Sequence, residues 1–299
     1  MTLDPISLTP MPQESEDAPL EYLPSAELRP PVSDLPHLSH AVLFFVLTVP
    51  MLFIGEALSL FLAKQSHLFS GKSYQALLSL MTSDARIAIP AQALTYLLTL
   101  LAAIIIFPVF WRRPFTHGVH WNLDAARARF LWLFGLGLAL GFGITLVGNY
   151  LPMPKDPPIM QDMMRSQLGA WMMLIFGVSC APLLEEIAFR GFLLPGLIHA
   201  LCWLMKREIL SAESLSWATV PLSIVLTTIP FALLHATQVS HAWAPLLLIG
   251  LVSVALCVVR LRLKSVAAST VVHAAYNFTL FAGLLLQTDG FRHLERLTS

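Results

Sequence analysis

The sequence predicts an all-α fold, a polytopic membrane helix bundle of seven transmembrane helices, with eight as the alternative count. Hydrophobic residues make up 56% of the 299 residues and charged residues only 12%, which is about half the charged fraction of soluble domains. The hydrophobic residues also fall into separate runs of roughly 20, the length that crosses a bilayer as a helix. We therefore expect an integral, multi-pass membrane protein, with the plasma (inner) membrane as its location.

Charge and cysteine content argue against other classes of protein. The formal net charge is zero, so no basic surface for nucleic acid is expected. The three cysteines, Cys180, Cys202 and Cys257, lie in apolar runs without CxxC spacing, which argues against a disulfide framework and a structural zinc site. We interpret them as small buried hydrophobic residues.

The first 38 residues differ in composition from the rest of the chain. They are rich in Pro, Glu, Asp and Ser and contain Arg29 as their single Lys or Arg, which predicts a disordered N-terminal tail over 1–38. No Lys/Arg-rich stretch precedes a short apolar run there, so we expect no cleaved signal peptide and expect the first hydrophobic helix to direct insertion. Three parts follow the tail: N-terminal transmembrane helices (39–168), a catalytic transmembrane core (169–287) and a short C-terminal tail (288–299).

Seven apolar runs define the predicted spans. They are residues 38–63, 87–111, 130–151, 169–205, 217–236, 242–259 and 266–286. The fourth run is too long for one straight span, and Pro182, Gly191 and Pro195 interrupt it, so we expect either a kinked helix or a span followed by a partly embedded helix. Splitting this run in two gives the eight-span alternative.

Positive charges between the spans predict the orientation in the membrane. Basic residues cluster in the loop at 112–129 and again at 260–264, and the positive-inside rule places both loops in the cytoplasm. A seven-span chain then has a cytoplasmic N-terminus, with the loop at 152–162 and the C-terminus outside. An eight-span chain would move Lys206, Arg207 and the 260–264 cluster to the outside, which the same rule disfavours.

The stretch CAPLLEEIAFR, residues 180–190, places three ionisable groups inside an apolar run. Such groups are costly at membrane depth and survive mainly where they pair or function. Glu186 and Arg190 are four residues apart and share a helix face, which favours an ion pair between them. Glu185 points about 100° away from Glu186 and remains available for another partner. A purely structural pair that locks helices together is the alternative for Glu186 and Arg190.

Each of two further spans contains a histidine and a second notable residue four positions away. Phe231 and His235 are one turn apart in the fifth span, and His273 and Asn277 are one turn apart in the seventh. Three helices can therefore turn these groups and Glu185 toward one cavity. A carboxylate with a histidine can deprotonate water, and a histidine with an amide can stabilise an oxyanion, as hydrolysis of an acyl bond requires. Interhelical hydrogen bonding is the alternative for each polar residue, and we interpret Phe231 as packing that orients His235.

The sequence resembles the CPBP intramembrane proteases. EEIAFR at 185–190, FALLH at 231–235 and HAAYN at 273–277 match, in order, the EExxxR, FxxxH and HxxxN motifs of that family. The family includes CAAX prenyl endopeptidases and bacteriocin-processing or bacteriocin-immunity relatives, and is also called the Abi family. The resemblance covers about 169–286, whereas the first three spans match only as hydrophobic helices.

The resemblance implies a glutamic endopeptidase that acts on peptide or protein substrates, CAAX-type prenylated or otherwise hydrophobic. By this resemblance Glu185 activates the attacking water with help from His235. His273 and Asn277 stabilise the oxyanion. Glu186 and Arg190 organise the site.

The same residues also allow a metal site or a role without catalysis. Zinc on Glu185, His235 and His273 is conceivable, but the resemblance favours the metal-free glutamate mechanism, so no cofactor is expected. The alternative function is a non-enzymatic membrane protein, either a peptide binder of the bacteriocin-immunity type or a proton-coupled transporter.

Two other features stand outside the motifs. Glu56 lies in the first span and is interpreted as an interfacial or cavity-lining residue. Glycines at every second position from Gly135 to Gly143, with Ala139 in their midst, permit close helix contact in the third span. We interpret this run as packing within the chain, with dimerisation as the alternative.

Overall fold

A computed structural model describes residues 36–154, 166–207 and 217–297, and all regular elements in these ranges are helices. The longer elements are α1 (Leu38–Gln65), α3 (Ala85–Trp111), α6 (Phe130–Gly148), α8 (Gln167–Val178), α9 (Cys180–Glu186), η3 (Ile187–Leu193), α10 (Leu194–Lys206), α12 (Thr219–Leu234), α13 (Trp243–Leu263) and α14 (Val266–Gln287). Short elements connect or follow them: η2 (His67–Phe69), α2 (Tyr74–Leu80), α4 (Phe115–Gly118), α5 (Leu123–Ala128), η4 (Thr237–Val239) and η5 (Leu294–Leu297). The all-α prediction is confirmed.

Each of the seven predicted spans coincides with a helical unit. In the described ranges six units are long and apolar enough to cross a membrane, and α12, with 16 residues, is a shorter apolar helix. Large apolar side chains remain outward on these helices, such as Phe53, Ile105 and Leu131, which are 65%, 69% and 83% exposed. Such surfaces suit contact with lipid rather than water.

Some sequence predictions fall where the structure describes little. Residues 1–35 of the predicted disordered tail and most of the predicted outer loop at 152–162 lie outside the described residues. Helix α14 ends at Gln287, and the predicted division of the chain into a tail and three further parts stays a prediction.

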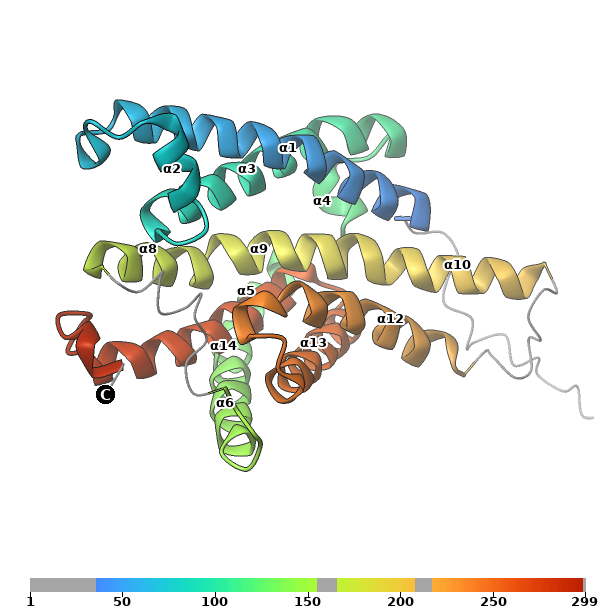
Figure 1. Ribbon diagram of the computed structural model, residues 1–299. Coiled ribbons are helices and arrows are strands. Elements are labelled where there is room, and N and C mark those ends of the chain that lie inside the picture. Colours follow the sequence, from blue (N-terminus) through green and yellow to red (C-terminus); the bar gives the residue numbers. More distant parts are fainter. Residues whose placement is uncertain (1–35, 155–165, 208–216, 298–299) are drawn as a thin grey trace, which may run out of the picture. The chain divides into compact units, whose positions relative to one another are not determined.

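The fourth apolar run forms one interrupted helical unit of 40 residues from Gln167 to Lys206, which Figure 1 shows crossing the middle of the bundle. Regular α-helix stops at Val178, four residues before Pro182, because a proline ring collides with the carbonyl four residues earlier and supplies no N–H. A π-helical turn, η3, follows α9. Such turns often accompany functional sites. The unit is helical throughout, and no loop divides it.

The long unit separates two groups of helices. Figure 1 shows α1 and α3 side by side above it, and α12, α13 and α14 below it. The α1–α3 pair is close because Gly55 lacks a side chain: a Cβ there would lie 2.5 Å from Thr95 Oγ1 and 2.8 Å from the Thr95 nitrogen. Three segments of the long unit, α8, α9 and η3, contact helices of both groups.

The glycine run of α6 packs against α14, which carries His273 and Asn277. A Cβ on Gly137 would lie 2.5 Å from the Val272 carbonyl oxygen. A Cβ on Gly141 would meet the side chain of Thr279, whereas Gly135 and Gly143 face open space. The alternate glycines therefore serve contact within the chain, and α6 supports the helix that bears half of the predicted site.

The two basic loops meet at one end of the bundle. The Val266 N–H donates to the His120 carbonyl at 3.0 Å, and the Ser265 hydroxyl donates to the Asn122 carbonyl at 2.6 Å. A common side for both loops is what the seven-span interpretation requires. Their placement in the cytoplasm stays a prediction.

Gly137→Ala is expected to destabilise the bundle by about 1–3 kcal/mol, because the new methyl group meets backbone atoms of α14 that cannot move aside. The measurement is the apparent melting temperature of the purified protein in detergent, followed by the fraction that stays monodisperse after heating. Gly143→Ala on the same helix is the matched control and should be neutral or slightly stabilising, since alanine favours helix. Equal effects of the two changes would contradict the α6–α14 contact.

Candidate active site

The centre of the site is a fully buried ion pair between Glu186 and Arg190. Arg190 Nη1 lies 2.9 Å from Glu186 Oε1, and both side chains are 0% exposed. Arg190 Nη2 also donates to the Ser253 carbonyl at 2.9 Å and to the Ser253 hydroxyl at 2.8 Å. The guanidinium lies 4.4 Å from the centre of the Phe231 ring, in the range of a cation–π contact. The predicted pair is present, and it ties η3 to α12 and α13.

Two polar atoms of this buried ion pair lack a hydrogen bond. Within the described part of the chain, Glu186 Oε2 and Arg190 Nε have no hydrogen-bond partner. Burying ionised groups costs several kcal/mol per ion unless they are paired and hydrogen-bonded. The arrangement is therefore better suited to fixing geometry than to maximising stability.

His273 connects the two glutamates. Its Nδ1 lies 3.0 Å from Glu186 Oε1, and its Nε2 lies 3.8 Å from Glu185 Oε2. A carboxylate only accepts hydrogen bonds, so His273 Nδ1 carries a hydrogen and donates a hydrogen bond to Glu186. The buried pair thereby sets the orientation of the imidazole, and Nε2 is directed at Glu185.

His235 caps the C-terminal end of α12 and turns back on it. Its Nδ1 lies 2.9 Å from the Phe231 carbonyl oxygen, and the two rings are 5.0 Å apart. Because a carbonyl can only accept, Nδ1 is the donor, and in the neutral ring Nε2 keeps a free lone pair. Phe231 thus orients His235 through its carbonyl as well as through its ring.

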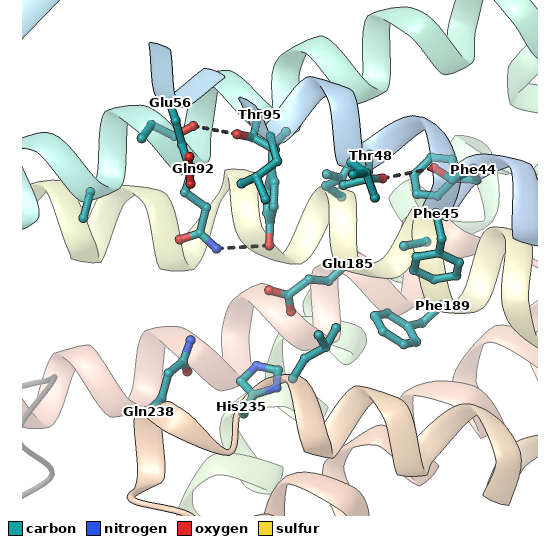
Figure 2. A pocket seen from close by; sticks show the side chains of 18 of the residues that line it. Phe44, Phe45, Thr48, Glu56, Gln92, Thr95, Glu185, Phe189, His235 and Gln238 are labelled. Carbon is teal, nitrogen blue, oxygen red and sulfur yellow. Dashed lines mark hydrogen bonds between the residues drawn. The ribbon is translucent and has the colours of Figure 1, made fainter. Parts of the chain in front are cut away.

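Glu185 and His235 open onto one cavity of about 530 Å³ between α1, α3, the long central unit and α12. Figure 2 shows both side chains turned into this space. Tyr96 also lines the cavity, and the Gln92 amide donates to the Tyr96 hydroxyl at 3.3 Å. The adjacent glutamates therefore face different surroundings, one toward the cavity and one toward the buried ion pair.

Asn277 lies on α14 one turn beyond His273. Its Nδ2 donates to the Gly177 carbonyl at 2.7 Å, near the end of α8 where the regular helix stops. One of its two amide hydrogens is therefore used in joining α14 to α8 and one is left over. Neither His273 nor Asn277 is among the described residues that line the cavity, although His273 Nε2 lies 3.8 Å from Glu185 Oε2.

The structure brings most of the predicted site residues close to one another. Among the described residues, no three His, Cys, Asp or Glu side chains are grouped so that they could hold a metal ion. Glu185, His235 and His273, the conceivable zinc ligands, therefore do not form such a group. Catalysis without a cofactor stays a prediction.

Sequence reasoning missed two residues that contact the site. Tyr96 comes from α3, in the part of the chain that carries no motif, and Ser253 is a single serine in an apolar run. Polar residues in a membrane span were the available signal, because such groups seek partners on neighbouring helices. Only the packing of α3 and α13 against the central unit shows which partners they find.

Arg190→Ala is expected to lower the free energy of unfolding by about 3–5 kcal/mol, because Glu186 would remain buried without its counter-charge. Arg262→Ala, at an exposed position on α13, removes the same charge and should change it by no more than about 0.5 kcal/mol. Denaturant-dependent loss of tryptophan fluorescence in detergent micelles would report both values. Similar small changes in the two variants would show that the buried pair does not hold the helices.

A comparison with known protein families finds a match, which covers the part of the chain that carries the motifs. A family model described as type II CAAX prenyl endopeptidase Rce1-like matches residues 167–279, a range that includes every motif residue from Glu185 to Asn277. Comparison with curated proteins and with solved structures yields no match. The predicted resemblance to the CPBP proteases is confirmed. Residues 167–279 therefore form a domain of the Rce1-like family of type II CAAX prenyl endopeptidases, carried by an integral, multi-pass membrane protein.

Proposed function

We propose that this protein is an intramembrane glutamic endopeptidase in which Glu185 and His235 activate a water molecule that hydrolyses a peptide bond. The observation that carries the proposal is that Glu185 and His235 open onto one cavity among membrane-spanning helices. The family supports CAAX-type endopeptidase activity in general. A prenylated or otherwise hydrophobic peptide is the substrate class that we infer from it.

In the proposed first step, a water molecule lies between Glu185 and His235. It donates one hydrogen bond to the Glu185 carboxylate and the other to His235 Nε2, whose lone pair is free because Nδ1 donates to the Phe231 carbonyl. Glu185 takes a proton as the water oxygen attacks the carbonyl carbon of the scissile bond. The product of this step is a tetrahedral intermediate with a negative oxygen.

In the second step the C–N bond breaks. Glu185 returns its proton to the departing nitrogen, which leaves as an amine, and the carbonyl carbon becomes a carboxylic acid. Atoms and charges balance with water as the only co-reactant. Glu185 is again a carboxylate as soon as it has returned this proton, and the new carboxylic acid then loses its own proton to solvent.

Stabilisation of the oxyanion is assigned to His273 and Asn277. His273 Nδ1 donates to Glu186, so His273 can donate from Nε2 only when both ring nitrogens carry protons. The carboxylate oxygens of Glu186 and Glu185 lie 3.0 Å and 3.8 Å from the two ring nitrogens of His273. The remaining amide hydrogen of Asn277 is the second candidate donor.

Glu185→Ala and Glu185→Gln are both expected to lower kcat by about 10²–10⁴, because neither side chain can take a proton from water. The assay is cleavage of a farnesylated CAAX peptide by protein in lipid nanodiscs. Proteomics of cells that contain the wild type or Glu185→Ala identifies peptide C-termini that depend on Glu185. Asp124→Asn, at an exposed position on α5, is the control for loss of one carboxylate and should leave kcat unchanged.

Retained cleavage in Glu185→Gln would exclude the general-base role. A biological activity that survives Glu185→Ala without any change in C-termini would point to binding or transport instead of proteolysis.

A further inference from the structure

A second carboxylate, Glu56, faces the cavity that contains Glu185 and His235. It lies in the second half of α1, inside a span, and Figure 2 shows it at the opposite side of the cavity from His235. An ionisable group at this depth is a candidate for function when it faces a cavity. The catalytic steps proposed above make no use of it.

The groups next to Glu56 are engaged elsewhere. The Thr95 hydroxyl donates to the Ala91 carbonyl at 2.9 Å, which is the dashed line drawn beside Glu56 in Figure 2, and Gln92 donates to Tyr96. Among the described residues, no lysine, arginine or histidine forms an ion pair with Glu56. The Glu56 carboxylate therefore lies in the cavity wall without an ion-pair partner in the described part of the chain.

The backbone fixes where this carboxylate lies. Gly55 packs against the backbone and hydroxyl of Thr95, at distances that leave no room for a side chain. This contact fixes the position of the next residue, Glu56, along the axis of α1 relative to α3. A carboxylate on a rigid element can select a partner by position as well as by charge.

The cavity is negative overall. Its described lining contains two carboxylates, Glu56 and Glu185, and neither lysine nor arginine. The nearby guanidinium of Arg190 is fully buried against Glu186 and does not line it. Since charges act strongly where water is scarce, this space attracts a cation.

The cavity also has two chemically different ends. Phe44, Phe45 and Phe189 line one end, and Glu56, Gln92 and Gln238 line the other, with Glu185 between them in Figure 2. Phe45 and Glu56 are eleven residues apart on one helix, which is about 16 Å at 1.5 Å per residue. An extended peptide of about five residues spans that length.

We propose that Glu56 forms a subsite for a basic side chain, lysine or arginine, of the substrate peptide. An apolar group of the same substrate lies at the aromatic end, and the scissile bond lies between the two at Glu185 and His235. This inference rests on the proposed function, because it places a peptide in the cavity. Glu56 is thus a specificity-determining residue rather than a catalytic one.

Binding to inactive protein tests the subsite separately from catalysis. The probes are fluorescent farnesylated CAAX peptides in which a single lysine, or the uncharged norleucine in its place, is moved along the chain. Each is titrated against Glu185→Ala protein in nanodiscs of neutral lipid, with and without Glu56→Gln. At one position or at two adjacent ones, lysine should bind roughly tenfold tighter than norleucine, and Glu56→Gln should remove this preference.

Two further variants sharpen the result. Glu56→Asp keeps the charge and should retain most of the preference, whereas Asp124→Asn removes a carboxylate outside the cavity and should retain all of it. A lysine-to-norleucine ratio that is the same with and without Glu56→Gln at every position overturns the subsite. Binding that shows the preference while wild-type protein cleaves no peptide would instead contradict the proposed protease and leave the subsite standing.

Discussion

The ion pair between Glu186 and Arg190 holds together parts of the chain that are far apart in sequence. Arg190 reaches Ser253 on α13 and stacks on Phe231 of α12, and Glu186 receives His273 of α14. Each of these contacts is directional, so the four segments can meet in few other registers. The positions of both histidines follow from this constraint: Phe231 carries His235 on its carbonyl, and Glu186 turns His273 toward Glu185.

Two adjacent glutamates with different roles are a consequence of helix geometry. A rotation of about 100° per residue is enough to place one side chain inside the protein and the next in a cavity. Here Glu186 is completely buried, while the side chain of Glu185 is 17% exposed. The break at Val178 and the π-helical turn from Ile187 lie on either side of this dipeptide, so the helix is irregular where it has to serve both surroundings.

The sequence allowed much of the site to be predicted because motif spacing is a local property. A four-residue step fixes which side chains share a helix face, and it identified Glu186 with Arg190, Phe231 with His235, and His273 with Asn277. Contacts between helices were less accessible. Tyr96 and Ser253 reach the site only through the packing of α3 and α13, and no periodicity in their own segments indicates a partner.

The apolar runs predicted the helical units, since a bilayer needs roughly 20 such residues in a helix. The same rule gave no means of deciding how the run at 169–205 would bend. Its course depends on the proline at 182 and on contacts with helices above and below it. The role of Glu56 was similarly open, because a carboxylate in a span looks the same in sequence whether it faces lipid headgroups or a cavity.

The spacing of Glu186 and Arg190 also bears on how the protein enters the membrane during synthesis. A lone arginine or acidic residue near the middle of a span raises the cost of insertion by about 2.5–3.5 kcal/mol. These two lie one turn apart in a single helix, so they can neutralise each other before α12, α13 and α14 have been made. The pair that later anchors the site therefore adds less to the cost of inserting this segment than two separate charges would, and the serine, phenylalanine and histidine that complete its surroundings are recruited afterwards.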